Sequence, residues 1–188
     1  MIHRKRAFPL EKVYTLLEPG PVVLVSTLPR RKARGPLAGR PNVMPMSWHL
    51  MMDFEPPLVG CVISNRNFSF AAVKSTRELV LNIPTSELAK KVVACGNSSG
   101  ADTDKFERFG LTAVPSKTVA PPQIAECYAS LECRVIDTRL TGAYCLFIIE
   151  VLHAAVDGSV KSPKTIHHRG YGKLMVAGRE TKLSSRMR

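Results

Sequence analysis

Short apolar runs rich in β-branched residues are the feature that most restricts the fold of this 188-residue chain. Runs of about four to eight such residues, closed by proline or by polar turns, are typical of buried strands. They do not alternate regularly with helical patterns, as they would around a parallel sheet. Five strands are therefore expected, at 21–28 (PVVLVSTL), 57–64 (PLVGCVIS), 78–84 (ELVLNIP), 129–137 (ASLECRVID) and 145–156 (CLFIIEVLHAAV).

The run 129–137 alternates apolar and polar residues, which predicts a strand with one buried and one solvated face. The run 145–156 is its expected antiparallel partner, after the turn-like segment TRLTGAY. The inward side chains would be Ala129, Leu131, Cys133 and Val135, and the outward ones Ser130, Glu132 and Arg134.

Two short helices fit between the strands. One is expected over 68–76 (FSFAAVKST) with Ser69 capping its start, and one over 86–96 (SELAKKVVACG) with Ser86 as cap and Gly96 as stop. Many short strands and few helices predict a mainly β fold, a β-barrel with helical insertions. We expect one domain over 1–188 with its core at about 20–157, and a hairpin insertion at 29–41.

The net charge of +12 raises the question of a nucleic-acid partner, and its distribution argues against one. Residues 1–41 carry nine Lys/Arg against two Glu, and residues 158–188 carry eight against one, whereas residues 42–157 carry ten against twelve Asp/Glu. A binder of single strands needs aromatic residues among its basic ones, and the clusters at 30–34 and 179–188 contain none. The basic extensions are either solvated ends or a means of attracting an anionic small molecule such as a dinucleotide.

The five cysteines form no CxxC pair and lie mostly within apolar segments. They are therefore expected to fill the core, and neither a disulfide framework nor a metal site is expected. No apolar run approaches the roughly 20 residues that span a bilayer, and the basic start lacks the apolar stretch of a signal peptide. We expect a soluble, cytoplasmic protein without a membrane partner.

The segment 63–70 (ISNRNFSF) joins an expected strand to an expected helix and is rich in hydroxyl, amide and guanidinium groups. The chain has neither a GxGxxG nor a GxxxxGK[ST] loop for a nucleotide phosphate. A helix start with Arg66 beside Ser and Asn side chains suits one phosphate group. The same residues also suit an ordinary capped turn.

Five segments follow one another in a specific order: 21–28 (PVVLVSTL), 42–50 (NVMPMSWHL), 55–84 (EPPLVGCVISNRNFSFAAVKSTRELVLNIP), 94–112 (ACGNSSGADTDKFERFGLT) and 121–135 (PPQIAECYASLECRV). In this order they resemble the flavin reductase-like family of FMN-binding split barrels, which includes flavoredoxins and some ferric reductases. The resemblance implies a homodimeric split β-barrel with one FMN per subunit near the dimer interface.

The resemblance also implies which residues hold the flavin. The segment 42–50 would border the isoalloxazine ring and the ribityl chain through Pro45, Met46, Ser47 and Trp48, although Trp48 is equally suited to the core. The 5′-phosphate would be held by Ser64, Arg66 and Ser69, with Asn65 and Asn67 nearby.

Two further residues have both a flavin role and a structural alternative. Asn82 either bonds the flavin or satisfies backbone groups. Lys105 either lies near the N1–C2 edge of the ring, where its charge would stabilise reduced flavin, or pairs with Asp104 across a loop or the dimer interface.

The resemblance implies an oxidoreductase that takes hydride from NADH or NADPH and passes electrons to a flavin, metal or protein acceptor; no catalytic residue is assigned. The alternative is a flavoredoxin-like carrier without its own NAD(P)H turnover. The segment 166–174 (IHHRGYGKL) is either a tail loop or a cover for the flavin, with His168, Arg169 or Tyr171 shaping the acceptor pocket. The basic loop 30–40 is either solvated, a site for the NADPH 2′-phosphate, or a contact for an acidic protein.

Overall fold

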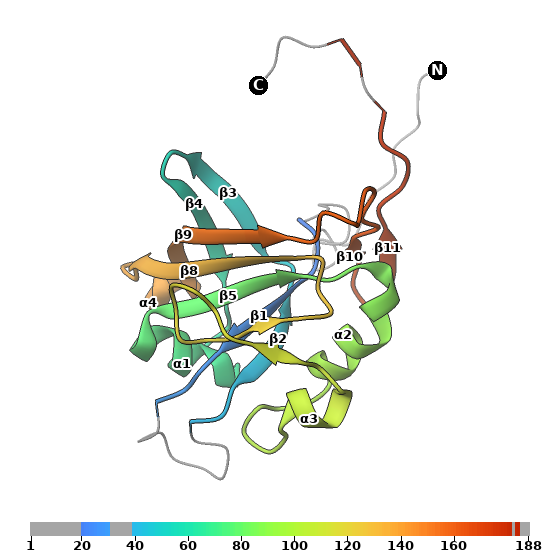
Figure 1. The fold of residues 1–188 in the computed structure, drawn as a ribbon. Helices are drawn as coiled ribbons and strands as arrows, with labels where there is room; N and C mark the ends of the chain where they lie inside the picture. The colour runs from blue at the N-terminus through green and yellow to red at the C-terminus, as the bar shows by residue number, and fades with distance from the viewer. Residues whose placement is uncertain (1–19, 31–38, 182, 185–188) are drawn as a thin grey trace, which may run out of the picture.

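The computed structural model describes residues 20–30, 39–181 and 183–184, and a seven-stranded sheet dominates them (Figure 1). All neighbouring strands are antiparallel, in the order β2-β1-β5-β8-β9-β4-β3. The two edge strands, β2 and β3, follow each other in the chain, so the sheet curls without closing, as in a split barrel. The strands are β1 (Val23–Thr27), β2 (Asn42–Met46), β3 (His49–Phe54), β4 (Pro57–Val62), β5 (Glu78–Ile83), β8 (Ala129–Asp137) and β9 (Leu146–Val156).

The five expected strands are confirmed as β1, β4, β5, β8 and β9, and β8 pairs antiparallel with β9 as predicted. The expected hairpin at 29–41 is also confirmed, because it connects β1 to β2, which pair from Val23↔Met46 to Thr27↔Asn42. The sequence did not separate β2 from β3. A tight turn at Ser47, whose carbonyl accepts a hydrogen bond from the N–H of His49, divides that segment.

The helices lie where the sequence predicts them, but their starts differ. Helix α1 (Phe68–Thr76) has Asn67 as its N-cap without a side-chain cap bond, and Ser69 lies inside its first turn. The second helix begins as a 3-10 turn, η2 (Ser86–Leu88), and continues as α2 (Ala89–Gly96). Ser69 and Ser86 are therefore not the caps that we expected. Two shorter helices are α3 (Lys105–Phe109) and α4 (Thr141–Tyr144).

Strand β1 is buried on both faces and separates two clusters of core side chains. Val23 and Val25 point into the curl of the sheet, where Phe147 and Ile149 of β9 also pack. Val22 and Leu24 point to the other face, which α2, α3 and the C-terminal segment cover. Burial on both faces explains why the 21–28 run is almost continuously apolar.

The C-terminal segment is a hairpin and not a tail loop. It consists of β10 (Ile166–His168) and β11 (Leu174–Val176), which pair antiparallel. Ile166 is fully buried, and its carbonyl accepts a hydrogen bond of 2.7 Å from the N–H of Val22. The hairpin is therefore fixed to the same face of β1 that α2 covers (Figure 1).

The expected alternation of β8 is only partly correct. Arg134 is exposed as predicted, but Ser130 and Glu132 are buried. The segment that contains β6 (Ala113–Val114) and β7 (Gln123–Ile124) folds over them. The Glu132 carboxylate accepts hydrogen bonds from the N–H groups of Lys117 and Thr118, from the Thr118 hydroxyl and from the Gln123 amide, at 2.6–3.0 Å.

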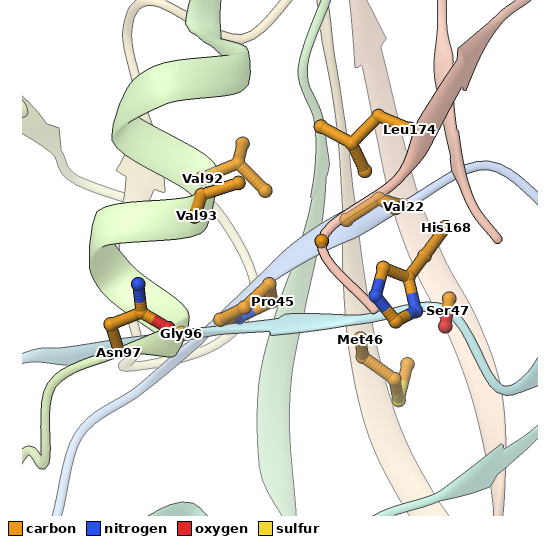
Figure 2. A pocket seen from close by; sticks show the side chains of 11 residues that line it. Val22, Pro45, Met46, Ser47, Val92, Val93, Gly96, Asn97, His168 and Leu174 are labelled. Carbon is orange, nitrogen blue, oxygen red and sulfur yellow. The ribbon is translucent and has the colours of Figure 1, made fainter. Parts of the chain in front are cut away.

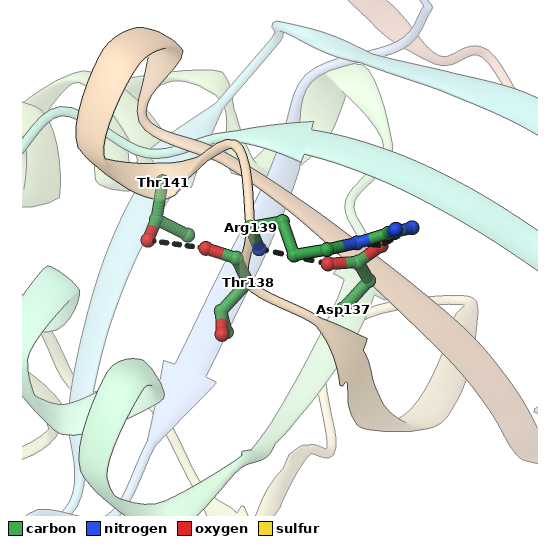
Figure 3. A network of polar contacts seen from close by, with 4 residues as sticks. All are labelled: Asp137, Thr138, Arg139 and Thr141. Atoms are coloured by element: carbon green, nitrogen blue, oxygen red, sulfur yellow. Dashed lines mark hydrogen bonds and ion pairs between the residues drawn. The ribbon is translucent and has the colours of Figure 1, made fainter.

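The turn after β8 is held by its own side chains (Figure 3). Arg139 donates to Asp137 through its backbone N–H and its guanidinium, at 2.6–2.8 Å, and the Thr141 hydroxyl donates to the Thr138 carbonyl at 2.7 Å. The hydrogen bonds from Arg139 lower the pKa of Asp137. This turn starts α4 and so returns the chain to pair β9 with β8.

All five cysteines are unpaired, and four of them are buried, which confirms that they mostly fill the core. Burial raises the pKa of the Cys61 and Cys127 thiols to about 12. Within the described ranges, none of the helices has the length and apolar character needed to cross a bilayer.

Candidate functional site

A polar cavity of about 400 Å³ lies where the start of α1, the strand β2 and the segment after α2 meet. It is rich in groups that donate hydrogen bonds. Its lining consists of Asn42, Met44, Pro45, Arg66, Asn67, Phe68, Ser69, Cys95, Gly96, Asn97, Ser98, Ser99, Gly100 and Lys105.

Two cationic side chains belong to this cavity. Arg66 is exposed, whereas Lys105 is only 3% exposed and donates from Nζ to the Cys95 carbonyl at 2.8 Å. Burial lowers the pKa of Lys105, and the Cys95 thiol opposes that shift. Asp104 forms an ion pair with Arg40 at 3.1 Å, so within one subunit its partner is Arg40 and not Lys105.

The N-terminus of α1 adds backbone donors to the same cavity. The N-cap residue Asn67 makes no side-chain cap bond, so among the described residues the first-turn N–H groups of Phe68 and Ser69 lie at the positive dipole end of the helix without a side-chain acceptor. Together with Arg66 and Lys105 they make a site suited to a phosphate or another small anion.

An apolar cavity of about 300 Å³ adjoins the polar one (Figure 2). The two cavities share Pro45, Gly96 and Asn97 in their linings, so they adjoin each other, and together they are called the groove, with a polar and an apolar part. A Cβ at Gly96 would lie 3.0 Å from Cγ of Pro45, which shows how closely α2 approaches β2 at the junction. The lining is Val22, Pro45, Met46, Ser47, Val92, Val93, Gly96, Asn97, His168, Gly172 and Leu174.

The β10–β11 hairpin supplies one wall of the apolar cavity. His168 lies across the cavity from α2, close to Ser47 and Met46 (Figure 2). Of the three tail residues considered from the sequence, His168 lines the cavity, whereas Arg169 and Tyr171 do not.

The structure brings seven of the predicted site residues into this groove. Pro45, Met46 and Ser47 line its apolar part, and Pro45 also lines the polar part. The other members in the polar part are Arg66, Asn67, Ser69 and Lys105.

Four predicted site residues line neither part. Ser64 and Asn65 are exposed, and the Ser64 hydroxyl accepts a hydrogen bond from the N–H of Arg66, so it shapes the turn. Trp48 is 56% exposed, which also makes its alternative role in the core wrong.

Asn82 is fully buried, and both ends of its amide are used by the core. Its Nδ2 donates to the Leu24 carbonyl and the Ser26 hydroxyl, and its Oδ1 accepts from Ile124 and Ser130. The structural alternative for Asn82 is therefore the one that matches its contacts.

The basic loop after β1 is described only at its ends. Arg30 donates to the Ser75 carbonyl at 2.7 Å, and Arg40 pairs with Asp104. The basic residues Arg31, Lys32 and Arg34, on which an NADPH clamp would depend, lie outside the described residues.

Sequence reasoning missed Asn42 and the run 96–100 (GNSSG) as parts of the site. The run does carry a recognisable pattern, because small polar residues follow the end of a helix there. Nothing in the sequence shows that it lies against the start of α1, about 30 residues earlier.

Comparison with known proteins agrees with this fold. A family model described as the flavin reductase like domain matches residues 16–175. An uncharacterized protein of Archaeoglobus fulgidus is 38% identical over 140 residues, which cover 71% of this chain and 79% of that protein.

Two solved structures resemble the chain over nearly its whole length. Flavoredoxin of Desulfovibrio vulgaris (Miyazaki F) gives a TM-score of 0.81 at 21% identity and covers 97% of both chains. The FMN-binding domain of a flavin reductases-like enzyme from Shewanella baltica OS155 gives 0.78 at 27% identity, over 95% of this chain and 97% of that one. The split-barrel fold is thus confirmed, and the chain belongs to the flavin reductase-like family.

Proposed function

We propose that this protein is an FMN-binding oxidoreductase that takes electrons from NADH or NADPH and passes them to a flavin, metal or protein acceptor. The observation that carries the proposal is the pair of adjoining cavities that make up the groove. Its polar part offers Arg66, Lys105 and the α1 N-terminus to a phosphate, and its apolar part offers a surface to a ring. A flavin mononucleotide has these two ends, and structural neighbours described as FMN-binding support the assignment.

FMN, when bound, supplies the capacity to accept a hydride and to release electrons singly or in pairs. The residues of the chain provide binding and orientation. Pro45 and Met46 would cover the ring and exclude water, while the hairpin residue His168 would close the opposite side. Because Lys105 lies with Ser69 in the polar part, we propose it as a phosphate ligand and no longer as a partner of the ring.

The direct test is the visible spectrum of the purified protein titrated with FMN, followed by anaerobic addition of NADH or NADPH. We expect bound FMN whose long-wavelength band bleaches with one of the two donors. Bound FMN that neither donor reduces would favour the flavoredoxin-like carrier. Failure to bind FMN at micromolar concentrations would overturn the proposal.

Arg66→Ala is expected to weaken FMN binding about tenfold, the equivalent of about 1.4 kcal/mol for one exposed charge-assisted contact. Riboflavin, which lacks the phosphate, should bind this variant as well as it binds the wild type. Fluorescence titration of both flavins measures the difference. Arg108→Ala, which removes an exposed arginine outside the groove, is the control, and an equal loss of both flavins in Arg66→Ala would contradict a phosphate contact.

We also propose that the protein is a homodimer, joined through β3 and the residue before it. The β3–β4 hairpin projects beyond the rest of the sheet (Figure 1). Strand β3 and the residue before it carry large apolar side chains that are exposed to solvent, and a contiguous patch of such side chains is unusual on a monomer. They are Trp48, Leu50, Met51, Met52 and Phe54, and Phe54 is 85% exposed.

The double variant Met51→Glu/Phe54→Glu is therefore expected to sediment as a folded monomer. Two carboxylates from each subunit would be buried in the dimer interface without compensation, so the dimer should weaken by several kcal/mol. Analytical ultracentrifugation measures this outcome. Val114→Glu, on β6 in a separate small sheet, is the control, and a wild type that sediments as a monomer would contradict the proposal.

The unpaired cysteines suit a reducing compartment. A cytoplasmic location, where NADH and NADPH are available, stays part of this proposal.

A further inference from the structure

Asn42, the first residue of β2, is buried beneath the polar part of the groove. Only 4% of it is exposed, and its Nδ2 donates to the Ser69 hydroxyl oxygen at 2.9 Å. Its Oδ1 is also buried but has no hydrogen-bond partner among the described residues. An unpaired buried acceptor costs about 1–3 kcal/mol, so the orientation of this amide does not satisfy all of its own hydrogen-bonding groups.

A steric contact restricts the position of the Asn42 amide. A Cβ at Gly100 would lie 2.1 Å from Oδ1 and 2.5 Å from Cγ of Asn42, so the amide rests directly on the Gly100 backbone. Only a glycine at position 100 leaves room for the Asn42 amide. The amide is therefore held between Gly100 and Ser69, with its nitrogen toward the hydroxyl.

This arrangement determines what the Ser69 hydroxyl offers to the cavity. A serine hydroxyl has one hydrogen to donate and two lone pairs that accept. Asn42 occupies one lone pair, and no acceptor for the hydrogen lies within hydrogen-bonding distance among the described residues. Since the hydrogen must point away from the Asn42 donor, it is available to the cavity that both residues line.

We infer that Asn42 is a positioning residue that presents the Ser69 hydroxyl as a donor to the phosphate of the flavin, and thereby helps to select FMN over riboflavin. The inference rests on the proposed function. Asn42 acts through Ser69, next to the cations Arg66 and Lys105 and the first-turn N–H groups of α1. An aspartate at position 42 would accept the Ser69 hydrogen instead, turn it away from the cavity and add a negative charge.

A double-mutant cycle on the full chain tests this coupling, with FMN and riboflavin affinities measured by fluorescence titration. Asn42→Ala and Ser69→Ala are each expected to weaken FMN binding about tenfold, which corresponds to one lost charge-assisted hydrogen bond, and to leave riboflavin unchanged. The double variant should be no worse than Ser69→Ala alone, because the two residues act as one unit. Asn42→Asp, which keeps the side-chain shape, should weaken FMN about a hundredfold.

The outcomes separate the inference from the proposed function. A wild type that binds neither flavin overturns both. If the wild type binds FMN but the variants lose as much riboflavin affinity as FMN affinity, only the role of Asn42 is overturned. The same holds if the two single losses of FMN affinity multiply in the double variant. Should Asn42→Ala fail to fold by circular dichroism, the near-isosteric Asn42→Asp decides, and unchanged discrimination in that variant overturns the inference.

Discussion

Replacing Glu132 with glutamine is expected to lower the free energy of unfolding by about 3 kcal/mol, the upper end of the cost of leaving a buried donor unpaired. The carboxylate is fully buried and accepts from four donors, two of which are backbone N–H groups that cannot turn away. The glutamine side chain fits the same space, but its NH₂ group would meet these donors instead of accepting from them. At least one buried donor would then be left unpaired in the 115–123 segment, which Glu132 ties to the sheet.

The pH dependence of stability provides a second readout of Glu132. Burial by itself raises its pKa, but the hydrogen bonds from Thr118, Lys117 and Gln123 outweigh burial and lower the pKa to about 2. Because this value lies below the ordinary 4.5, the carboxylate stabilises the fold above about pH 4.5. That contribution is lost as the pH falls from there toward 2.

Urea denaturation at pH 7 and at pH 3 measures both effects. The difference in the free energy of unfolding between wild type and Glu132→Gln should be largest at pH 7 and should become smaller in acid. Glu107→Gln, which changes an exposed carboxylate on α3, is the control and should stay within about 0.5 kcal/mol of wild type. A Glu132→Gln variant as stable as wild type at pH 7 would contradict the structural role of this carboxylate.

The error in the predicted orientation of Glu132 shows where sequence patterns stop being sufficient. Apolar residues at every second position identified β8 correctly, and a charged residue between them was assigned to solvent. Its ligands Lys117, Thr118 and Gln123 come from an irregular segment with no periodicity of its own. Only the folded chain brings that segment back over β8.

Like strand β8, the candidate site could be predicted from the sequence only in part. Within one segment the sequence placed Arg66 and Ser69 at a helix start, and the family resemblance added the stretch 45–47. The other half of the groove comes from Asn42, the run 96–100 and His168, which the sequence separates widely. Asn82 was misleading because a buried amide that satisfies the core has the same residue type as one that binds a ligand.

Gly100→Ala is expected to damage both the fold and FMN binding. The added Cβ would lie 2.1 Å from Asn42 Oδ1 and 2.8 Å from Cδ1 of Phe68, the first residue of α1. The backbone of Gly100 is outside the left-handed region, so steric contact alone sets the effect. Overpacking of this kind costs about 1–3 kcal/mol, and displacing Asn42 and the start of α1 should raise the FMN dissociation constant at least about a hundredfold.

Thermal denaturation and FMN titration measure these two losses, with Gly158→Ala as the control, since nothing lies within 4 Å of a Cβ there. Adding Asn42→Ala to Gly100→Ala should recover part of the stability, because the closest contact is removed. It should not recover FMN affinity, since the donor that orients Ser69 is then missing as well. Full FMN affinity in Gly100→Ala would mean that Asn42 moves freely, and the orientation of Ser69 would then need another cause.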